Sequence, residues 1–438
     1  MAGRFFGNIV LYIILALGYV EAWIGLMQWI GIQPSLHAGY AFTGTFYNPG
    51  PYACFLAVVV PLAVFMMREA EGRVIRYAAT GMVLLCAVLI PATLSRTALL
   101  AAVVGSAVAM SDCIRKYLWK FNRTRMLAAI GLTVVLAVGL YAVKKDSADG
   151  RLLIWKVAAE AAGEIPLTGV GWDNVAGAYG EAQERYFAAG KGSEQEMMVA
   201  DAPEYVFNEY LQVVISFGPL AGVLLVVILT GGFLMAMRRG GYGYAGSVAA
   251  IAIVMSASYP LQFPLFAVTI CLVLTGCYFF SRSVWLRMAG CGVIAGCGAM
   301  FLANSHRDDV GAKFSVGHAL HRQHRYHQSN EMLLDLMAKS SDPMILNIIG
   351  KNYQALGMSD SAEYYLRKSV NRCPNRLYPH YLLMLLYRDS MSYERDKMIR
   401  EAKILITQKE KIASPAVEEM QQKAREILSN ETSNSRMK

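Results

Sequence analysis

The chain has 438 residues, of which 55% are hydrophobic and 17% are charged, and its formal net charge is +9. This composition is too apolar for an ordinary soluble protein and too mixed for a bundle of membrane spans alone, so it predicts two regions of different class. The positive charge does not indicate nucleic-acid binding, because many basic residues lie in short loops between apolar runs, where they orient a membrane protein.

The cysteines and the N-terminus further limit the class of protein that this sequence can encode. None of the eight cysteines stands in a CxxC pair, which argues against a zinc site and against a disulfide framework. The first apolar run is longer than that of a cleavable signal peptide and lacks a small-residue cleavage site. We therefore expect the first segment to remain as a membrane anchor.

Apolar runs that are long enough, or nearly long enough, to cross a membrane occupy most of the first 305 residues. They predict an all-α fold, in which a polytopic transmembrane helix bundle of about nine spans is followed by a small α-solenoid. The runs cover residues 8–33, 51–67, 75–94, 96–111, 126–143, 207–235, 245–259, 265–280 and 284–303. The third and fourth are separated only by residues 93–97, and the seventh and eighth only by the sequence YPLQFP.

Basic residues in the short loops predict the orientation of the chain in the membrane. They follow the second, fourth, sixth and eighth spans: Arg68, Arg73 and Arg76; Arg115, Lys116, Lys120, Arg123 and Arg125; Arg238 and Arg239; Arg282 and Arg287. All of these loops then share the cytoplasmic side with the N-terminus. The long loop of residues 144–206, the corner at Ser95 and the YPLQFP corner lie together on the outer face, as one extracytoplasmic site would require.

Two domains are expected: residues 1–305, which include the long loop, and a helical domain of residues 306–438. Positions in the second domain fit the spacing of a tetratricopeptide repeat: Leu346, Ile349, Gly350, Tyr353, Gly357, Ala362, Leu366, Ser369 and Pro374, with Ser369 in place of the usual Ala. A degenerate second unit covers residues 377–405, and helices at 329–339 and 415–428 would complete the stack, since a stable solenoid needs about three repeats.

Two arginines are candidates for chemistry. Arg96 stands at the outer end of a span, where a cation is costly unless it has a function or anchors the helix at the interface. Arg151 lies near the start of the long loop, and Trp155 follows four residues later. In a helix, this spacing places the two side chains on the same face. The loop is acidic, with eleven carboxylates and six cations from Lys144 to Glu204. Arg151 would therefore act locally, either by forking onto phosphate oxygens or by pairing with a carboxylate.

The long loop also contains a plausible amphipathic helix, from Leu152 to Ala162, that ends at Gly163 and Pro166. It could hold a lipid-linked substrate at the level of the headgroups, or simply cover the bundle.

Asn208 and Glu209 lie at the outer entrance of the sixth span. A carboxylate there is available as a general base, but the helix dipole also favours an ordinary acidic residue at that position. Asn48 belongs to an Asn-Pro-Gly turn that enters the second span. Glu21, within the first span, could pair across the bundle and receives no functional role.

The histidines His318, His321, His324 and His327 recur every three residues. A metal site needs convergent ligands and partners behind them, and the sequence supplies neither, so a solvated helix is the preferred interpretation and no metal is expected.

Four motifs in order resemble the O-antigen ligase and polymerase superfamily of bacterial membrane glycosyltransferases. FTGTFYNPGPYACFLAVVVPLA is similar to its Gly-Thr-Phe-x-Asn-Pro segment, and SRTALLAA to its Ser-Arg-Thr helix start. GRLLIWKVAAEAAGEIPLTGVGW is similar to its Arg-x-x-x-Trp helix and Pro-x-x-Gly-x-Gly turn, and FNEYLQVVISFGPLAG to the segment that returns into the membrane. The resemblance covers roughly residues 42–222.

The resemblance implies an inner-membrane enzyme that takes an undecaprenyl-diphosphate-linked glycan as donor and transfers it on the periplasmic face. Arg96 and Arg151 match the two arginines that engage the donor diphosphate, and fixed cations of this kind stabilise such a leaving group without a metal or other cofactor. The acceptor hydroxyl would attack the anomeric carbon with inversion, helped by a base. The other predicted substrate-binding residues lie in the matching motifs: Trp155, Gly169, Gly171, Asn208 and Asn48.

This sequence departs from the family in two places. Many ligases have a histidine where this chain has Phe207, so Glu209 becomes the candidate base. The familiar motifs also begin after a single span, although family members usually have more spans before them. The chain is therefore expected to lack N-terminal helices or to depend on a partner.

The sequence leaves the acceptor open. If the acceptor is lipid A core, the protein is a ligase. If the acceptor is the growing glycan, it is a polymerase, and if the acceptor is a Ser or Thr of a protein, it is an oligosaccharyltransferase. A tetratricopeptide-like tail binds peptides or protein partners along its concave face, which favours a protein acceptor, with a ligase next. The alternative is a non-catalytic membrane subunit whose repeat domain recruits envelope proteins. A transporter is disfavoured, because no inverted repeat is evident.

Overall fold

The computed structural model describes residues 2–113, 145–279, 310–389, 392–408 and 414–436, with isolated positions between 284 and 298. Within these residues the chain forms helices and no strands, as the all-α prediction requires. It divides into two compact units. The first combines Met1–Val143, Phe207–Val213 and Pro219–His306, and the second combines Lys144–Val206, Val214–Gly218 and Arg307–Lys438.

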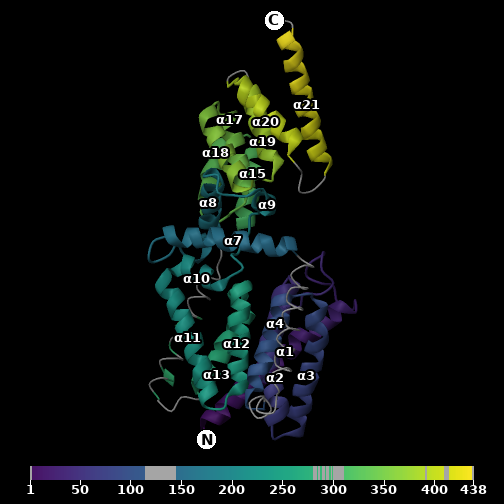
Figure 1. Cartoon of the computed structure of the whole chain (residues 1–438), viewed down its shortest axis with the longest axis vertical. Coiled ribbons are helices and arrows are strands. Elements are labelled where there is room, and N and C mark those ends of the chain that lie inside the picture. The colour runs from purple at the N-terminus through teal and green to yellow at the C-terminus, as the bar shows by residue number, and fades with distance from the viewer. Residues whose placement is uncertain are drawn as a thin grey trace, which may run out of the picture. The chain divides into compact units, whose positions relative to one another are not determined.

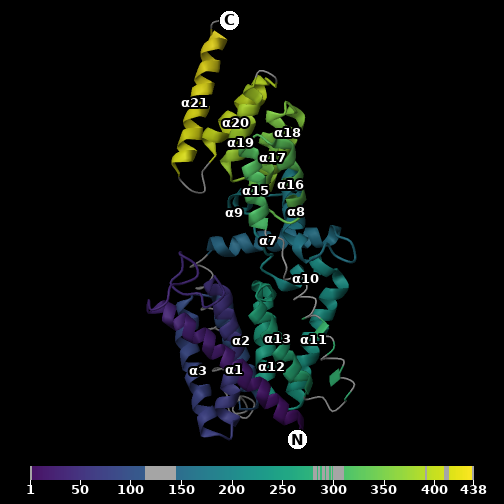
Figure 2. The same ribbon diagram turned by 180° about the vertical axis from the view of Figure 1, so that it is seen from behind.

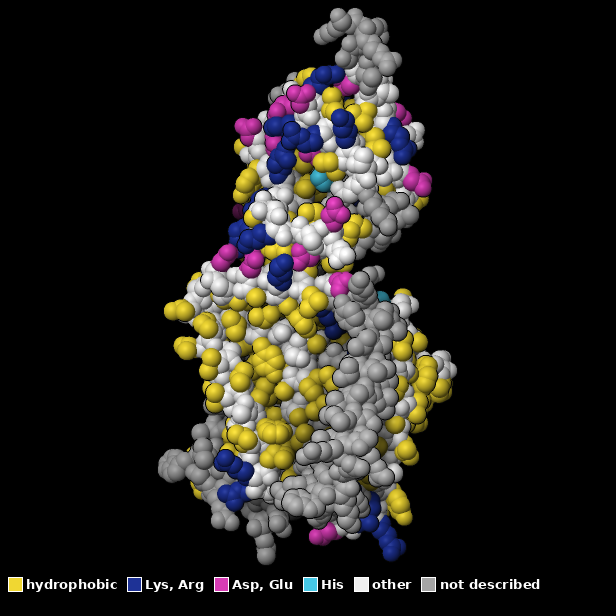
Figure 3. All heavy atoms as spheres, viewed as in Figure 1, with side chains coloured by type: hydrophobic (Ala, Val, Ile, Leu, Met, Phe, Trp, Pro, Cys, Tyr) yellow, Lys and Arg dark blue, Asp and Glu magenta, His cyan; other side chains and the backbone are white. Residues whose placement is uncertain are grey.

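The first unit is a bundle of apolar helices (Figures 1 and 2). Its helices are α1 (Ala2–Trp29), α2 (Pro49–Glu69), α3 (Arg73–Ala92), α4 (Arg96–Ala109), α11 (Pro219–Arg238), α12 (Tyr242–Ala257), the short η2 (Pro260–Gln262) and α13 (Pro264–Phe279). Among the described residues α1, α2, α3 and α11 are long and apolar enough to cross a membrane, and α4, α12 and α13 are shorter apolar helices. Hydrophobic side chains cover much of the face of the first unit seen in Figure 3, and the exposed ones on α11 include Leu220, Val223, Leu224, Val226, Val227 and Leu234, as expected for contact with lipid.

Helix α2 is the centre of this bundle, because it packs against α1, α3, α4 and α12 and most of its side chains are buried. Helices α4 and α12 approach each other at Gly105 and Gly246, where a Cβ on either glycine would collide with the backbone of the other helix. The Ser247 hydroxyl donates a hydrogen bond of 2.7 Å to the Val58 carbonyl, which ties α12 to α2. Small residues at such crossings let membrane helices pack through their backbones.

The two close hairpins fall where the sequence predicted them. The Ser95 hydroxyl caps α4 by accepting a hydrogen bond from the Ala98 amide, and η2 separates α12 from α13. The single span expected at residues 207–235 is instead two helices, α10 (Glu209–Phe217) and α11. They break at Gly218, whose φ of 86° suits glycine, and at Pro219, which has no amide hydrogen. The span predicted at 126–143, and most of the one at 284–303, lie outside the described residues.

The second unit contains the helices of the long loop and those of the C-terminal region. The loop supplies α7 (Lys145–Glu164), the short η1 (Trp172–Asn174), α8 (Val175–Ala188) and α9 (Glu194–Val199). The C-terminal helices are α15 (Val310–Arg322), α16 (Tyr326–Met337), α17 (Pro343–Ala355), α18 (Ser359–Arg372), α19 (Leu377–Arg388), α20 (Arg395–Thr407) and α21 (Pro415–Arg436). Helix α7 begins seven positions before the predicted start at Leu152.

The C-terminal helices pack in chain order, each against the next. Gly350 of α17 leaves no room for a Cβ beside the Leu366 side chain of α18, which explains glycine at this crossing. The Ser369 hydroxyl donates a hydrogen bond of 3.2 Å to the Pro343 carbonyl, so this serine adds a link that the usual alanine lacks. The side chain of Cys373, the residue that follows α18, is fully buried.

The loop and the C-terminal helices form one compact unit, whereas the prediction grouped the loop with the transmembrane residues 1–305. The physical reason is that α8 packs against α18 and buries Gln183, Arg372 and Tyr179 between them. The long loop is therefore part of the same packed core as the C-terminal region.

Candidate functional site

Asn48 stands at a junction of three segments of the first unit. Its Oδ1 atom accepts a hydrogen bond of 2.8 Å from the Gly50 amide and so caps α2, as expected for the Asn-Pro-Gly turn. Its Nδ2 atom donates to the Tyr259 hydroxyl at 3.3 Å, in the corner before η2. The Tyr259 ring meets Phe207 edge to face, with ring centroids 5.1 Å apart. Three of the motifs singled out in the sequence thus meet at Tyr259.

Glu209 begins α10 and is buried, with 0% of its surface exposed. Its Oε1 atom accepts a hydrogen bond of 2.8 Å from the Leu261 amide in η2. The carboxylate therefore occupies the favourable N-terminal end of a helix and holds the corner between α12 and α13.

Asn208 and Phe207 shape the entrance of α10. The Asn208 side chain accepts hydrogen bonds from the Tyr210 amide at 3.0 Å and the Leu211 amide at 3.2 Å, which makes it the N-cap of the helix. Phe207 has a φ of 53°, a strained value for a bulky residue. In this conformation the Phe207 ring packs against Tyr259.

Two polar residues of α1 were not assigned a role from the sequence, yet they hold the segment before Asn48. Glu21 is 1% exposed and accepts hydrogen bonds from the Thr45 hydroxyl at 2.6 Å and the Thr45 amide at 3.1 Å. Gln28 accepts from the Thr43 and Gly44 amides, both at 2.9 Å, and donates to the Gly44 carbonyl. Glu21 and Gln28 are seven residues apart, which places them on one face of α1. This spacing is the sequence feature from which their shared role could have been predicted.

Arg96 is the first residue of α4 and is partly buried, immediately after the Ser95 cap. The turn before it is strained at Leu94, where φ is 55°. Arg96 and Glu209 belong to the first unit, whereas Arg151 belongs to the second.

Arg151 and Trp155 lie on α7, both partly buried and four residues apart on one helical face, as predicted. The buried face of α7 consists of Leu153, Val157, Ala158 and Ala161, which recur at helical spacing. The helix expected at residues 152–162 is thus amphipathic, with its apolar face packed inside the second unit.

The glycines of the predicted turn hold the end of α10. The Val170 amide donates to the Ile215 carbonyl at 2.9 Å, and the Gly171 amide to the Ser216 carbonyl at 3.0 Å. Gly169 and Gly171 have φ values of 76° and 92°, which suit glycine, and a Cβ on Gly169 would collide with the Ser216 carbonyl. The turn and the returning segment therefore meet.

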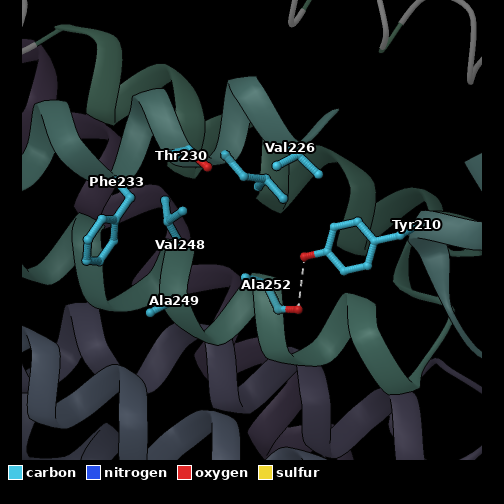
Figure 4. A pocket seen from close by; sticks show the side chains of 8 residues that line it. Tyr210, Val226, Thr230, Phe233, Val248, Ala249 and Ala252 are labelled. Atoms are coloured by element: carbon cyan, nitrogen blue, oxygen red, sulfur yellow. Dashed lines mark hydrogen bonds between the residues drawn. The ribbon is translucent and has the colours of Figure 1, made fainter. Parts of the chain in front are cut away.

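A cavity of about 230 Å³ lies between α10, α11 and α12 (Figure 4). Eight residues line it: Tyr210, Val226, Leu229, Thr230, Phe233, Val248, Ala249 and Ala252. The Tyr210 hydroxyl donates a hydrogen bond of 3.1 Å to the Ala252 carbonyl. None of these eight described residues is charged, so the cavity suits hydrocarbon and does not suit a diphosphate.

The histidines singled out in the sequence do not form a metal cluster. The His318 and His321 rings stack at 6.2 Å, and the His321 Nδ1 atom pairs with the Asn352 side chain at 2.6 Å. Burial is the largest cause of the lowered pKa of His321. Among the described residues no group of three or more His, Cys, Asp or Glu side chains could hold a metal ion.

The apolar helices define a multi-pass membrane protein. Within it, residues 81–226 match the family model described as O-antigen ligase, and the chain carries a domain of that family. This range includes Arg96, Arg151 and Glu209. The domain implies a membrane enzyme of glycan transfer, a ligase or glycosyltransferase, that acts on lipid-linked glycan. No curated protein and no solved structure matches the chain.

Proposed function

We propose that this protein is an inner-membrane glycosyltransferase that moves a glycan from undecaprenyl diphosphate to an acceptor on the periplasmic face. The observation that carries the proposal is the O-antigen ligase match over residues 81–226, which contains both arginines, in a chain with multiple apolar helices. About nine spans, a cytoplasmic N-terminus and a periplasmic loop and C-terminal domain complete the proposed topology.

Arg96 and Arg151 are proposed to bind the donor diphosphate. A guanidinium forks onto phosphate oxygens, and its charge stabilises the leaving group as the glycosidic bond breaks, so no metal is needed. Trp155 would pack beside the donor, one turn from Arg151 on the same face of α7. Asn48, Asn208, Gly169 and Gly171 would shape the surrounding site, since they cap α2 and α10 and form the turn against α10.

For Glu209 the geometry favours positioning over proton transfer. A base must reach the acceptor hydroxyl, whereas the Glu209 side chain is buried and binds the Leu261 amide. We therefore propose that Glu209 anchors the η2 corner beside the site, and we keep the base role as the competing outcome of its test.

The proposed acceptor is lipid A core or a protein. The helix pairs after residue 310, with glycine at the α17–α18 crossing, support a tetratricopeptide-like domain, and such domains bind protein segments. Polymerisation of the glycan itself is the second candidate activity. The other alternative, a non-catalytic subunit that recruits envelope proteins through the same domain, predicts no transfer at all.

The test is glycan transfer by the purified full-length protein from an undecaprenyl-diphosphate-linked oligosaccharide, with lipid A core, peptide and free glycan acceptors in parallel. Arg151→Ala is expected to lower transfer by about 100-fold or more, since a lost cation at a developing charge costs that much. Arg185→Ala is the matched control, because Arg185 is exposed in the same unit and pairs only weakly with Glu164 at the surface.

Transfer to one acceptor that depends on Arg151 and not on Arg185 would support the enzyme and name its acceptor. Absence of transfer to every acceptor, in folded protein, would favour the non-catalytic subunit.

A further inference from the structure

The long loop and the C-terminal helices meet at a close-packed interface inside the second unit. Gly177 of α8 leaves no room for a Cβ against the Ala338 carbonyl, and Gly180 lies against Ser341 and Arg372. Backbones approach this closely only where packing is specific. The contact is therefore a built interface between α8 and the segment from α16 to α18.

The centre of this interface is charged. The Glu184 carboxylate lies 3.4 Å from Lys368 and 3.5 Å from Arg372, and the Arg372 side chain has 0% exposure. Burial raises the pKa of Glu184 and lowers the pKa of Arg372, and their mutual attraction opposes both shifts. A buried guanidinium that loses its carboxylate is strongly destabilising, so each side of the interface depends on the other.

The C-terminal helices also hold the backbone that follows α9. The Asn375 Nδ2 atom donates to the Met198 carbonyl at 3.0 Å and to the Ala200 carbonyl at 2.6 Å. The Ser341 hydroxyl donates to the Pro203 carbonyl at 2.9 Å. These bonds satisfy backbone carbonyls of a loop that would otherwise have to find partners in water.

Helix α7, which carries Arg151, packs in turn on α8 and α9. Lys156 pairs with Glu196 at 2.9 Å, and Lys191 pairs with Glu160 at 3.2 Å. Leu153, two residues from Arg151, belongs to the buried face of α7. A continuous set of contacts thus runs from Asn375 and Arg372 to the helix of Arg151.

We propose that the C-terminal helical domain is a positioning part of the glycan-transfer site. Its Lys368 and Arg372 hold Glu184 of α8, and its Asn375 holds the backbone at the end of α9, so together they fix the helix that presents Arg151 to the donor. The role of Arg151 in this inference rests on the proposed function. The face of α16 to α18 that α8 covers is consequently not available to a protein partner.

The test uses the full-length protein and hydrogen exchange of the amides in α7. Glu184→Lys places like charges beside Lys368 and Arg372, and Asn375→Asp turns a donor to two carbonyls into an acceptor. Each change is expected to raise α7 exchange about tenfold or more. Adding Lys368→Glu to Glu184→Lys restores an opposite-charge pair between positions 184 and 368 and should recover part of the protection, because Arg372 still lacks the carboxylate at position 184.

The matched control is Glu363→Lys. Glu363 also lies between two cations, Arg367 at 2.8 Å and Lys397 at 3.1 Å, but all three belong to the C-terminal helices. This variant should leave α7 exchange within about twofold of the wild type. Exchange in α19 and α20 reports in every variant whether the C-terminal domain is still folded.

In the transfer assay, Glu184→Lys and Asn375→Asp should raise the KM for the donor about five- to tenfold and leave the KM for the acceptor unchanged. Unchanged α7 exchange in both variants would overturn the proposal, and so would lost protection without a change in donor KM. A wild-type protein that transfers no glycan would contradict the proposed function instead, and the exchange data would still decide whether the C-terminal helices hold α7.

Discussion

The Leu261 amide donates a hydrogen bond of 2.8 Å to the Oε1 atom of Glu209, across 52 residues of sequence. This bond joins the start of α10 to the corner between α12 and α13. The same corner supplies Tyr259, which binds Asn48 and packs on Phe207. One carboxylate therefore supports a junction where the Asn-Pro-Gly turn, the start of α10 and the η2 corner meet.

Glu209→Gln is expected to keep transfer within about threefold of the wild type, because the glutamine oxygen can accept the same hydrogen bond from the Leu261 amide. Glu209→Ala leaves that amide without its acceptor and should destabilise the protein by about 1–3 kcal/mol. Transfer and thermal unfolding would be measured for both variants. A Glu209→Gln protein that is stable but about 100-fold or more slower would instead establish the base role.

Gly218→Ala is expected to be more destabilising than Gly190→Ala. Both glycines have positive φ, 86° and 68°, so both substitutions carry the cost of a left-handed conformation, about 1–2 kcal/mol. Only at Gly218 would the new Cβ also collide with the Leu167 carbonyl, whereas Gly190 has nothing within 4 Å. Equal melting temperatures for the two variants would show that the close approach between Gly218 and the Leu167 carbonyl does not affect the stability of the protein.

Thr45→Val tests the polar anchor of the segment before Asn48. It removes a hydroxyl that donates to the buried Glu21 carboxylate at 2.6 Å, and hydrogen bonds to charged groups contribute about 1.5–3 kcal/mol. Thr80→Val is the control, because the exposed Thr80 hydroxyl binds only the carbonyl of Arg76 one turn earlier and its loss should cost no more than about 0.5 kcal/mol. Thermal unfolding in detergent distinguishes them, and equal effects would mean that Glu21 does not hold Thr45.

The stability of the loop helices should depend on pH through Glu196. Burial opposes its ionisation, but hydrogen bonds from the Ser193 amide, Lys156 and Tyr186 outweigh this and lower its pKa to about 2. A depressed carboxylate pKa stabilises the fold above the unfolded pKa, near 4.3, and this contribution is lost as the pH falls toward 2. The difference in melting temperature between wild type and Glu196→Gln should therefore be largest at pH 6 and become smaller below about pH 4. A difference that is constant from pH 6 to pH 3 would contradict this assignment.

Much of the membrane fold could be predicted from the sequence. Helices α1 to α4, α12 and α13 lie where long apolar runs predicted spans, because a backbone in lipid must satisfy its own hydrogen bonds and does so as a helix. The break at Gly218 and Pro219 was missed, although a Gly-Pro pair is a known breaker, since the apolar run continues on both sides. Apolar length alone does not reveal where a helix turns.

The sequence by itself determined the helical class, the hairpin corners and the motifs that contain Arg96, Arg151 and Glu209, because these depend on local composition and spacing. Only the tertiary structure decided that α8 and the C-terminal helices share a core, and that the Glu209 carboxylate binds the Leu261 amide in η2. The residues responsible are ordinary in sequence, and Gln183 reaches the Arg372 carbonyl across 189 positions. Contacts of this kind follow from the packing of distant surfaces, which no local pattern encodes.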